Sequence, residues 1–125
     1  MSDSSPNQDF DLSFLYEIAD GSNEFLVDSI DMFLQQTPQL LGAIEAAIVA
    51  GDWVTAGGAS HKLKPNLGFF GMLQCQATMQ EVELLCKAGG QDVAAINSKF
   101  GQIKSIVNNN LIKLAQIKAE KEALL

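Results

Sequence analysis

Residues 22–50, SNEFLVDSIDMFLQQTPQLLGAIEAAIVA, carry the pattern that decides the fold. Eight of their large apolar side chains fall within roughly 120° of a helical wheel, which indicates one buried stripe on an amphipathic helix. Ser22 is a suitable N-cap, and Pro38 predicts a kink because its ring removes one backbone hydrogen bond. The stretch therefore predicts one long helix with a buried stripe made of Leu26, Ile30, Phe33, Leu34, Leu40, Leu41, Ile44 and Ile48.

Helical patterns flank this stretch on both sides. Before it, apolar residues at helical spacing predict a short helix over residues 11–19. After it, Gly51 and Asp52 provide a stop and a new cap, and the next helix runs to about Leu67. The buried arc of that helix is predicted to contain Trp53, Ala56, Ala59, Ser60, Leu63 and Leu67.

Two more helices follow in the C-terminal half. One is predicted from Met72 to about Lys87, where Gly89 and Gly90 end it, and the last begins near Gln91 and spans about 30 residues. No window shows the alternation of apolar and polar residues that strands require. The sequence therefore predicts an all-α fold, an antiparallel four-helix bundle with a short additional N-terminal helix. The sulfur-containing residues predicted to fill its core are Met32, Met72, Cys75, Met79 and Cys86.

Composition limits the classes of function. The chain has 8 Lys+Arg against 15 Asp+Glu, a net charge of −7 that disfavours nucleic acid as a partner. No apolar run approaches the about 20 residues of a membrane helix. No export signal is evident, so we expect a cytoplasmic protein. We expect one domain, with residues 1–9 as a flexible lead-in and residues 10–125 as the bundle.

The stretch SHKLKPNLGFFG, residues 60–71, contains the only histidine of the chain. On a wheel with Trp53 at the origin, His61 falls outside the buried arc, so we expect its ring to face solvent. Mostly small residues share this face and leave room for a partner protein to approach the ring. These expected docking residues are Val54, Gly57, Gly58, Pro65 and Gly68.

Two of the residues that follow the histidine, Lys64 and Pro65, are expected to shape its chemistry. Lys64 is three positions on, so its Cβ lies about 5–6 Å from that of His61, and its cation can pair with a phosphoryl group on the imidazole. Lys62 points elsewhere and is expected to be a solvated surface charge. Pro65 predicts a bend at His61, because its ring crowds the carbonyl four residues earlier; alternatively, it begins a terminal turn.

A histidine followed by Leu63, Lys64 and Gly71 at the second, third and tenth positions resembles the signature of histidine-containing phosphotransfer (HPt) domains from bacterial multistep phosphorelays. The resemblance covers about residues 10–90. It implies that His61 accepts a phosphoryl group from an aspartyl phosphate on a receiver domain and passes it to another receiver. Further segments that look like the family are DLSFL at 11–15, FL at 25–26, FLQQTP at 33–38 and AGDW at 50–53.

The resemblance also implies that the domain lacks a cofactor and that it binds particular partner proteins. It would be a phosphocarrier without a nucleotide site or a cofactor, and not an enzyme on its own. The Mg²⁺ needed for transfer would sit in the receiver. The implied partners are response-regulator receivers, a hybrid sensor histidine kinase, or both, and an isolated domain of this type is expected to be a monomer.

The chain also departs from the family pattern. Pro65 replaces the usual glycine four positions after the histidine, which puts the docking angle or the choice of partner in doubt. Leu67 stands where a smaller residue is more common. Family members often place a glutamine or a basic residue near the histidine from the next helix, and of Gln80, Glu83 and Lys87 we favour Lys87 for that position.

Two other functions fit parts of the pattern. Ser60 to Pro65 superficially resembles the histidine box of a sensor kinase dimerisation region, but there an acidic residue follows the histidine and the proline comes one position later. The second alternative is a bundle that binds a receiver without accepting phosphate. Val54 and Phe69 would contribute to a docking patch in either a carrier or a pure binding module.

Overall fold

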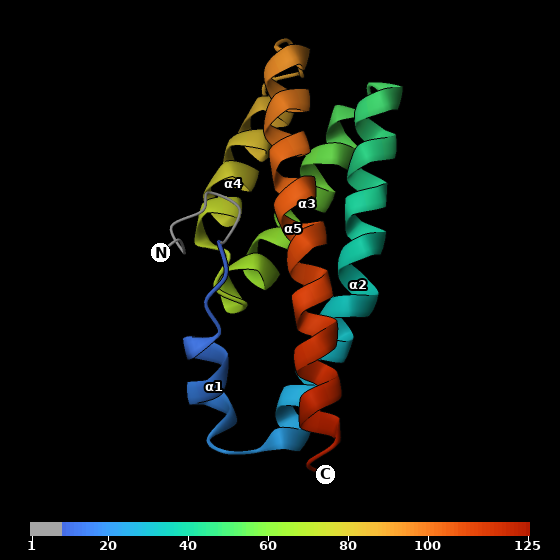
Figure 1. Cartoon of the computed structure of the whole chain (residues 1–125). Coiled ribbons are helices and arrows are strands. Elements are labelled where there is room, and N and C mark those ends of the chain that lie inside the picture. Colours follow the sequence, from blue (N-terminus) through green and yellow to red (C-terminus); the bar gives the residue numbers. More distant parts are fainter. Residues whose placement is uncertain (1–8) are drawn as a thin grey trace.

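The computed structural model describes residues 9–125, which fold into helices without any strand. The all-α class predicted from the sequence is therefore confirmed, and the helices begin and end close to the predicted positions (Figure 1). They are α1 (Ser13–Ala19), α2 (Asn23–Ala50), α3 (Trp53–Phe69), α4 (Leu73–Lys87) and α5 (Val93–Glu122).

The four long helices pack around one core. Helix α2 contacts α3 and α5, and α4 contacts the same two helices. Along α2 to α5 the chain reverses direction at each turn, and α1 lies near the end where α2 begins and α5 ends (Figure 1). Large apolar side chains from all five helices fill the interior, among them Leu15, Ile30, Ile44, Leu63, Met79 and Ile103.

Side-chain caps fix where three helices begin. The Ser22 hydroxyl accepts a hydrogen bond from the Phe25 N–H at 3.1 Å, and Asp52 Oδ1 accepts one from the Thr55 N–H at 3.2 Å. Asp92 caps α5 in the same way. Because each cap satisfies an N–H that has no partner inside the helix, these residues define the helix starts.

The two internal prolines do not interrupt their helices. Helix α2 continues through Pro38, and α3 continues through Pro65 as far as Phe69. The bends expected at Pro38 and at His61 stay predictions. Since α3 is unbroken around the histidine, the residues on either side of Pro65 keep helical positions on one surface.

One methionine was placed wrongly. Met72 and Met79 are fully buried, but Met32 is 57% exposed because it lies on the outer side of α2. The two cysteines are buried as expected, and neither is in a disulfide. Burial, reinforced by the neighbouring Asp9 carboxylate, raises the pKa of the Cys75 thiol to about 12, so this thiol is protonated and unreactive.

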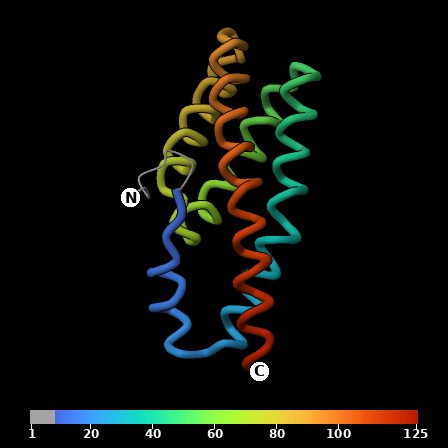
Figure 2. Tube along the Cα trace, in the orientation of Figure 1, coloured from blue at the N-terminus to red at the C-terminus, as the bar shows by residue number. Residues whose placement is uncertain are grey.

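The segment before α1 is attached to two other helices. Asp9 Oδ1 and Oδ2 accept hydrogen bonds from the N–H groups of Gln74 and Cys75 at 3.0 and 2.7 Å, at the start of α4. Asn110 of α5 donates its side-chain amide to the Asp9 carbonyl at 3.0 Å. Figure 2 shows this segment passing the beginning of α4. Residues 1–8 of the expected lead-in lie outside the described residues, whereas Asp9 is held in place.

Candidate functional site

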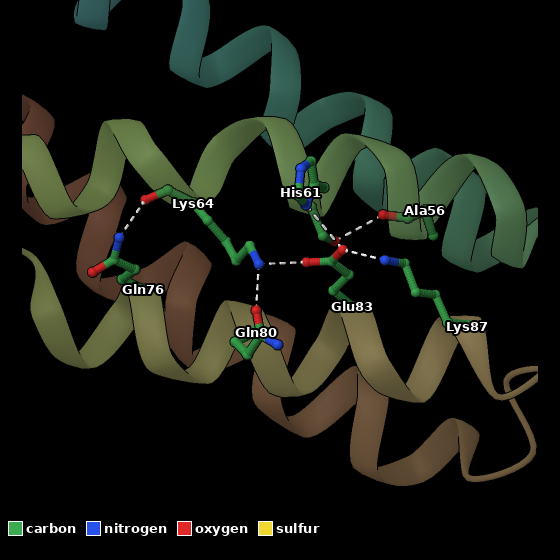
Figure 3. Close-up of polar contacts among 8 residues, drawn as sticks. Ala56, His61, Lys64, Gln76, Gln80, Glu83 and Lys87 are labelled. Atoms are coloured by element: carbon green, nitrogen blue, oxygen red, sulfur yellow. Dashed lines mark hydrogen bonds and ion pairs between the residues drawn. The ribbon is translucent and has the colours of Figure 1, made fainter.

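His61 projects from the surface of α3. Its side chain is 68% exposed, as the wheel predicted. The ring is anchored on one side only, where Nδ1 lies 3.0 Å from Oε2 of Glu83 on α4 (Figure 3). The imidazole is thus oriented by a contact from the neighbouring helix while most of its surface stays open to a partner.

The carboxylate of Glu83 is the centre of the site. Its side chain is only 3% exposed, yet two ammonium groups reach it: Lys64 Nζ lies 2.7 Å from Oε1, and Lys87 Nζ lies 2.7 Å from Oε2. Burial would raise the pKa of this carboxyl, but hydrogen bonds and charges from Lys64 and Lys87 outweigh it and lower the pKa to about 2. Glu83 is therefore ionised at neutral pH.

The charge of Glu83 determines which ring nitrogen of His61 carries the hydrogen. An ionised carboxylate can only accept hydrogen bonds, so Nδ1 must be the donor to Oε2. In the neutral ring, the lone pair then belongs to Nε2. The arrangement presents Nε2 of an exposed imidazole as a nucleophile and leaves no choice of tautomer.

Lys64 is fixed more firmly than Lys87. Its side chain is 19% exposed, against 62% for Lys87, and its ammonium also donates to Oε1 of Gln80. The Gln76 amide donates to the Lys64 carbonyl at 3.1 Å. Lys64 is thus held by α4 at its side chain and at its backbone.

The helix α4 residues that reach the site form one polar seam, defined by Gln76, Gln80, Glu83 and Lys87. Their spacing of four, three and four residues places them on one face of α4, the face that lies along α3 (Figure 3). Ser60, next to the histidine, is fully buried and donates its hydroxyl to the Ala56 carbonyl at 2.7 Å. The polar seam therefore runs along the contact between α3 and α4, with Glu83 as its buried member.

Gly57 does not have the exposed position that the sequence predicted. It is buried, and a Cβ added there would lie 3.5 Å from the Cys86 Cβ. A helical wheel of α3 contains no information on α4, which covers the surface of α3 at Gly57. Gly58 is exposed, with nothing within 4 Å of an added Cβ, and Val54 is 88% exposed.

Shallow hollows lie on both sides of the histidine. One, towards the start of α3, is lined by residues that include Val54, Gly58 and Lys87. Another is lined by His61, Lys64 and Pro65 together with residues of α4.

A further hollow adjoins Pro65, Gly68 and Phe69. Phe69 is only half-buried and meets the ring of Phe14 edge-on, with the centroids 5.5 Å apart. Of the residues expected to dock a partner, Val54, Gly58 and Pro65 are thus exposed, Gly68 and Phe69 are half-buried, and Gly57 is buried.

Of the residues that the sequence offers for the position beside the histidine, Lys87 was predicted in preference to Gln80 and Glu83. The structure brings both to the site, and Gln80 as well, with Glu83 at the centre. A signal for Glu83 was available. It lies in the same helical stripe as the buried residues Met79, Val82 and Cys86, and a carboxylate in a core stripe needs charged or hydrogen-bonding partners.

Residues 9–125 offer neither a cluster of metal ligands nor a membrane-spanning helix. No group of three or more His, Cys, Asp or Glu side chains is placed to hold a metal ion. Nor does this part of the chain include a helix long and apolar enough to cross a membrane.

The chain matches a protein-family model over most of its length. The family model of the Hpt domain matches residues 28–120, a range that contains α3, α4 and all the site residues described above. Comparison with curated proteins finds no significant match, and neither does comparison with solved structures. The match spans most of the chain, and the family is the one that the residues around His61 resemble. The chain therefore belongs to the Hpt domain family.

Proposed function

We propose that this protein is a phosphocarrier in a phosphorelay: His61 accepts a phosphoryl group from the aspartyl phosphate of one receiver domain and passes it to another. One observation carries the proposal. The exposed imidazole is oriented through Nδ1 by a buried, ionised carboxylate, and two lysine ammonium groups gather at the same carboxylate. This supplies a positioned nucleophile and nearby positive charge, which phosphoryl transfer requires.

The transfer step follows from the geometry. The Nε2 lone pair forms the N–P bond, and the P–O bond to the receiver aspartate breaks with its electron pair returning to that carboxylate. Lys64 stands beside the ring and pairs with the phosphoryl oxygens. In this proposal the Mg²⁺ belongs to the receiver, and the carrier itself uses neither nucleotide nor cofactor and is no enzyme without its partner.

Two features of the fold suit this role. The histidine stands on a rigid helix, and the surface beside it is open to a partner. We take α2 to α5 to form the antiparallel four-helix bundle expected from the sequence, with the histidine on a helix instead of a loop. The receiver would dock over Val54, Gly58 and the hollow beyond Pro65. The protein would act as a cytoplasmic monomer that exchanges phosphate with response regulators, a hybrid sensor kinase, or both.

The direct test is phosphoryl transfer. The protein is incubated with a panel of aspartyl-phosphorylated receiver domains and Mg²⁺, and acid-labile, base-stable phosphate is measured on the wild type and on His61→Gln. We expect label on the wild type alone. Lys64→Gln should slow transfer about tenfold, the effect of losing one charge-assisted contact, whereas Lys62→Gln, a change at an exposed neighbour, should not.

The same experiment separates the carrier from a pure binding module. A folded protein that binds a receiver with equal affinity before and after His61→Gln, but is never labelled, would overturn the carrier function. Light scattering after size-exclusion chromatography checks the monomer, because a kinase dimerisation region would elute as a dimer.

A further inference from the structure

Before phosphorylation, the charges at the site are concentrated on one buried group. Glu83 carries one negative charge and holds both ammonium groups, Lys64 at Oε1 and Lys87 at Oε2. Nδ1 of the imidazole donates to the same Oε2 that Lys87 occupies. His61 and Lys87 thus share one oxygen atom.

Phosphorylation of the ring redistributes these charges. When Nε2 forms the N–P bond, Nδ1 keeps its hydrogen, so the ring gains one positive charge without taking up a proton. The phosphoryl group brings a charge of about −2. A new cation then lies against Glu83, and a new dianion lies outside it, within the reach of flexible lysine side chains.

We propose, on the basis of the phosphocarrier function above, that Glu83 exchanges counter-ions during the reaction. It holds Lys64 and Lys87 beside the unphosphorylated histidine, and it gives them up to the phosphoryl group when the ring itself becomes its cation. Glu83 is thereby a positioning residue: it fixes the ring through Nδ1 and keeps two lysines ready without touching phosphorus.

The mobility of the groups favours this exchange. Glu83 is 3% exposed and stays in the helix interface, while Lys87 is 62% exposed, so the lysine can move and the carboxylate cannot follow it. Lys64 is the more enclosed cation, but its side chain still reaches the surface hollow that includes His61. The two ammonium groups and the imidazole all begin on one carboxylate, so the exchange needs only side-chain rotation.

The first test uses the wild-type protein with phosphoramidate as the donor; its P–N bond breaks and ammonia leaves. The lysine ammonium ¹⁵N resonances are followed by NMR while ³¹P spectra report phosphohistidine. We expect the Lys64 and Lys87 signals to shift as the phosphohistidine signal grows, and the Lys62 signal to stay. Phosphohistidine with unmoved Lys64 and Lys87 signals would overturn the exchange and leave the carrier function intact.

A second test measures whether Glu83 becomes the counter-ion of the phosphorylated ring. In Glu83→Gln the phosphorylated ring loses its anionic partner, so we expect the proton affinity of its Nδ1 to fall about tenfold, seen as a ¹⁵N titration displaced by one pH unit. Glu81→Gln removes an exposed carboxylate two residues away and serves as the control. Identical titrations in the wild type and Glu83→Gln would refute the role given to Glu83.

Different results would contradict the phosphocarrier function and the counter-ion exchange. If neither phosphoramidate nor a phosphorylated receiver ever labels His61 in the folded protein, both the carrier function and the exchange are overturned. If Glu83→Gln does not fold, as judged by circular dichroism, the wild-type lysine spectra still decide the exchange.

Discussion

Gly71 lies directly against the backbone of Asp11. A Cβ atom at Gly71 would come within 1.7 Å of the Asp11 carbonyl oxygen, and the glycine has a φ of +73°, in the left-handed region. The turn between α3 and α4 therefore closes onto the segment that precedes α1. Gly71 is also the last residue of the motif that begins at His61, and its approach to Asp11 shows that this position of the motif serves the fold.

Replacing Gly71 with alanine should destabilise the protein by about 2 kcal/mol or more. The side chain would impose backbone strain at positive φ and would push the Asp11 segment away from the turn. Urea unfolding measures the change. The matched control is Gly101→Ala in α5, where an added Cβ meets nothing within 4 Å and alanine should stabilise the helix by up to about 1 kcal/mol. Equal stabilities for the two variants would contradict this account.

Glu83 should make the free energy of unfolding fall with pH in the acid range. Its pKa is lowered to about 2 in the folded protein from an ordinary value of 4.5, so folding favours the ionised form. The resulting stabilisation is complete above pH 4.5 and is lost as the pH falls towards 2. Urea midpoints of the wild type should therefore drop more steeply over this range than those of Glu83→Gln. Glu81→Gln should follow the wild type, and parallel curves for all three proteins would argue against the prediction.

Two exposed valines provide a test of the docking surface. Val54 is 88% exposed near His61, and Val49 is 84% exposed near the end of α2. If a receiver covers Val54, Val54→Gln should raise KM for the phosphorylated receiver about fivefold and leave kcat unchanged, whereas Val49→Gln should change neither. Steady-state transfer assays give both constants. An equal effect of the two substitutions would show that the receiver does not dock over Val54.

Gly68 makes room for the amide of Gln76. An added Cβ at Gly68 would lie 2.5 Å from Gln76 Nε2, so alanine must displace the amide from the Lys64 carbonyl. Gly68→Ala should cost about 1 kcal/mol in the wild type, but should be neutral or stabilising in the Gln76→Ala background. A double-mutant cycle from unfolding midpoints measures this coupling. Additive effects would mean that the two side chains do not compete for space.

Much of the fold could be predicted because each helix carries its own local signals. The stripe of α2 and the capping residues Ser22 and Asp52 depend only on residues a few positions apart. The place of Asp9 could not be predicted in this way, since its partners Gln74 and Cys75 are more than sixty residues distant. Met32 was misplaced because residue type indicates a preference for burial but not the direction in which the side chain points.

The site was predictable as far as one helix determines it. The exposure of His61 follows from the geometry of α3 alone, and the wheel placed it correctly. The roles of Glu83 and Gly57 depend on which face of α4 meets α3 and on the register of that contact. A single-helix projection contains neither quantity, so the carboxylate at the centre of the site and the burial of the glycine emerged only from the packed pair.

The hydrogen bond from Asn110 to the Asp9 carbonyl has a consequence for the order of folding. It joins residues 101 positions apart, and the Asp9 carboxylate binds α4 as well. Closing so long a loop is entropically costly until the intervening helices are in place. Asp9 can therefore reach its final position only after the last helix has been synthesised, which makes its docking a late step in folding.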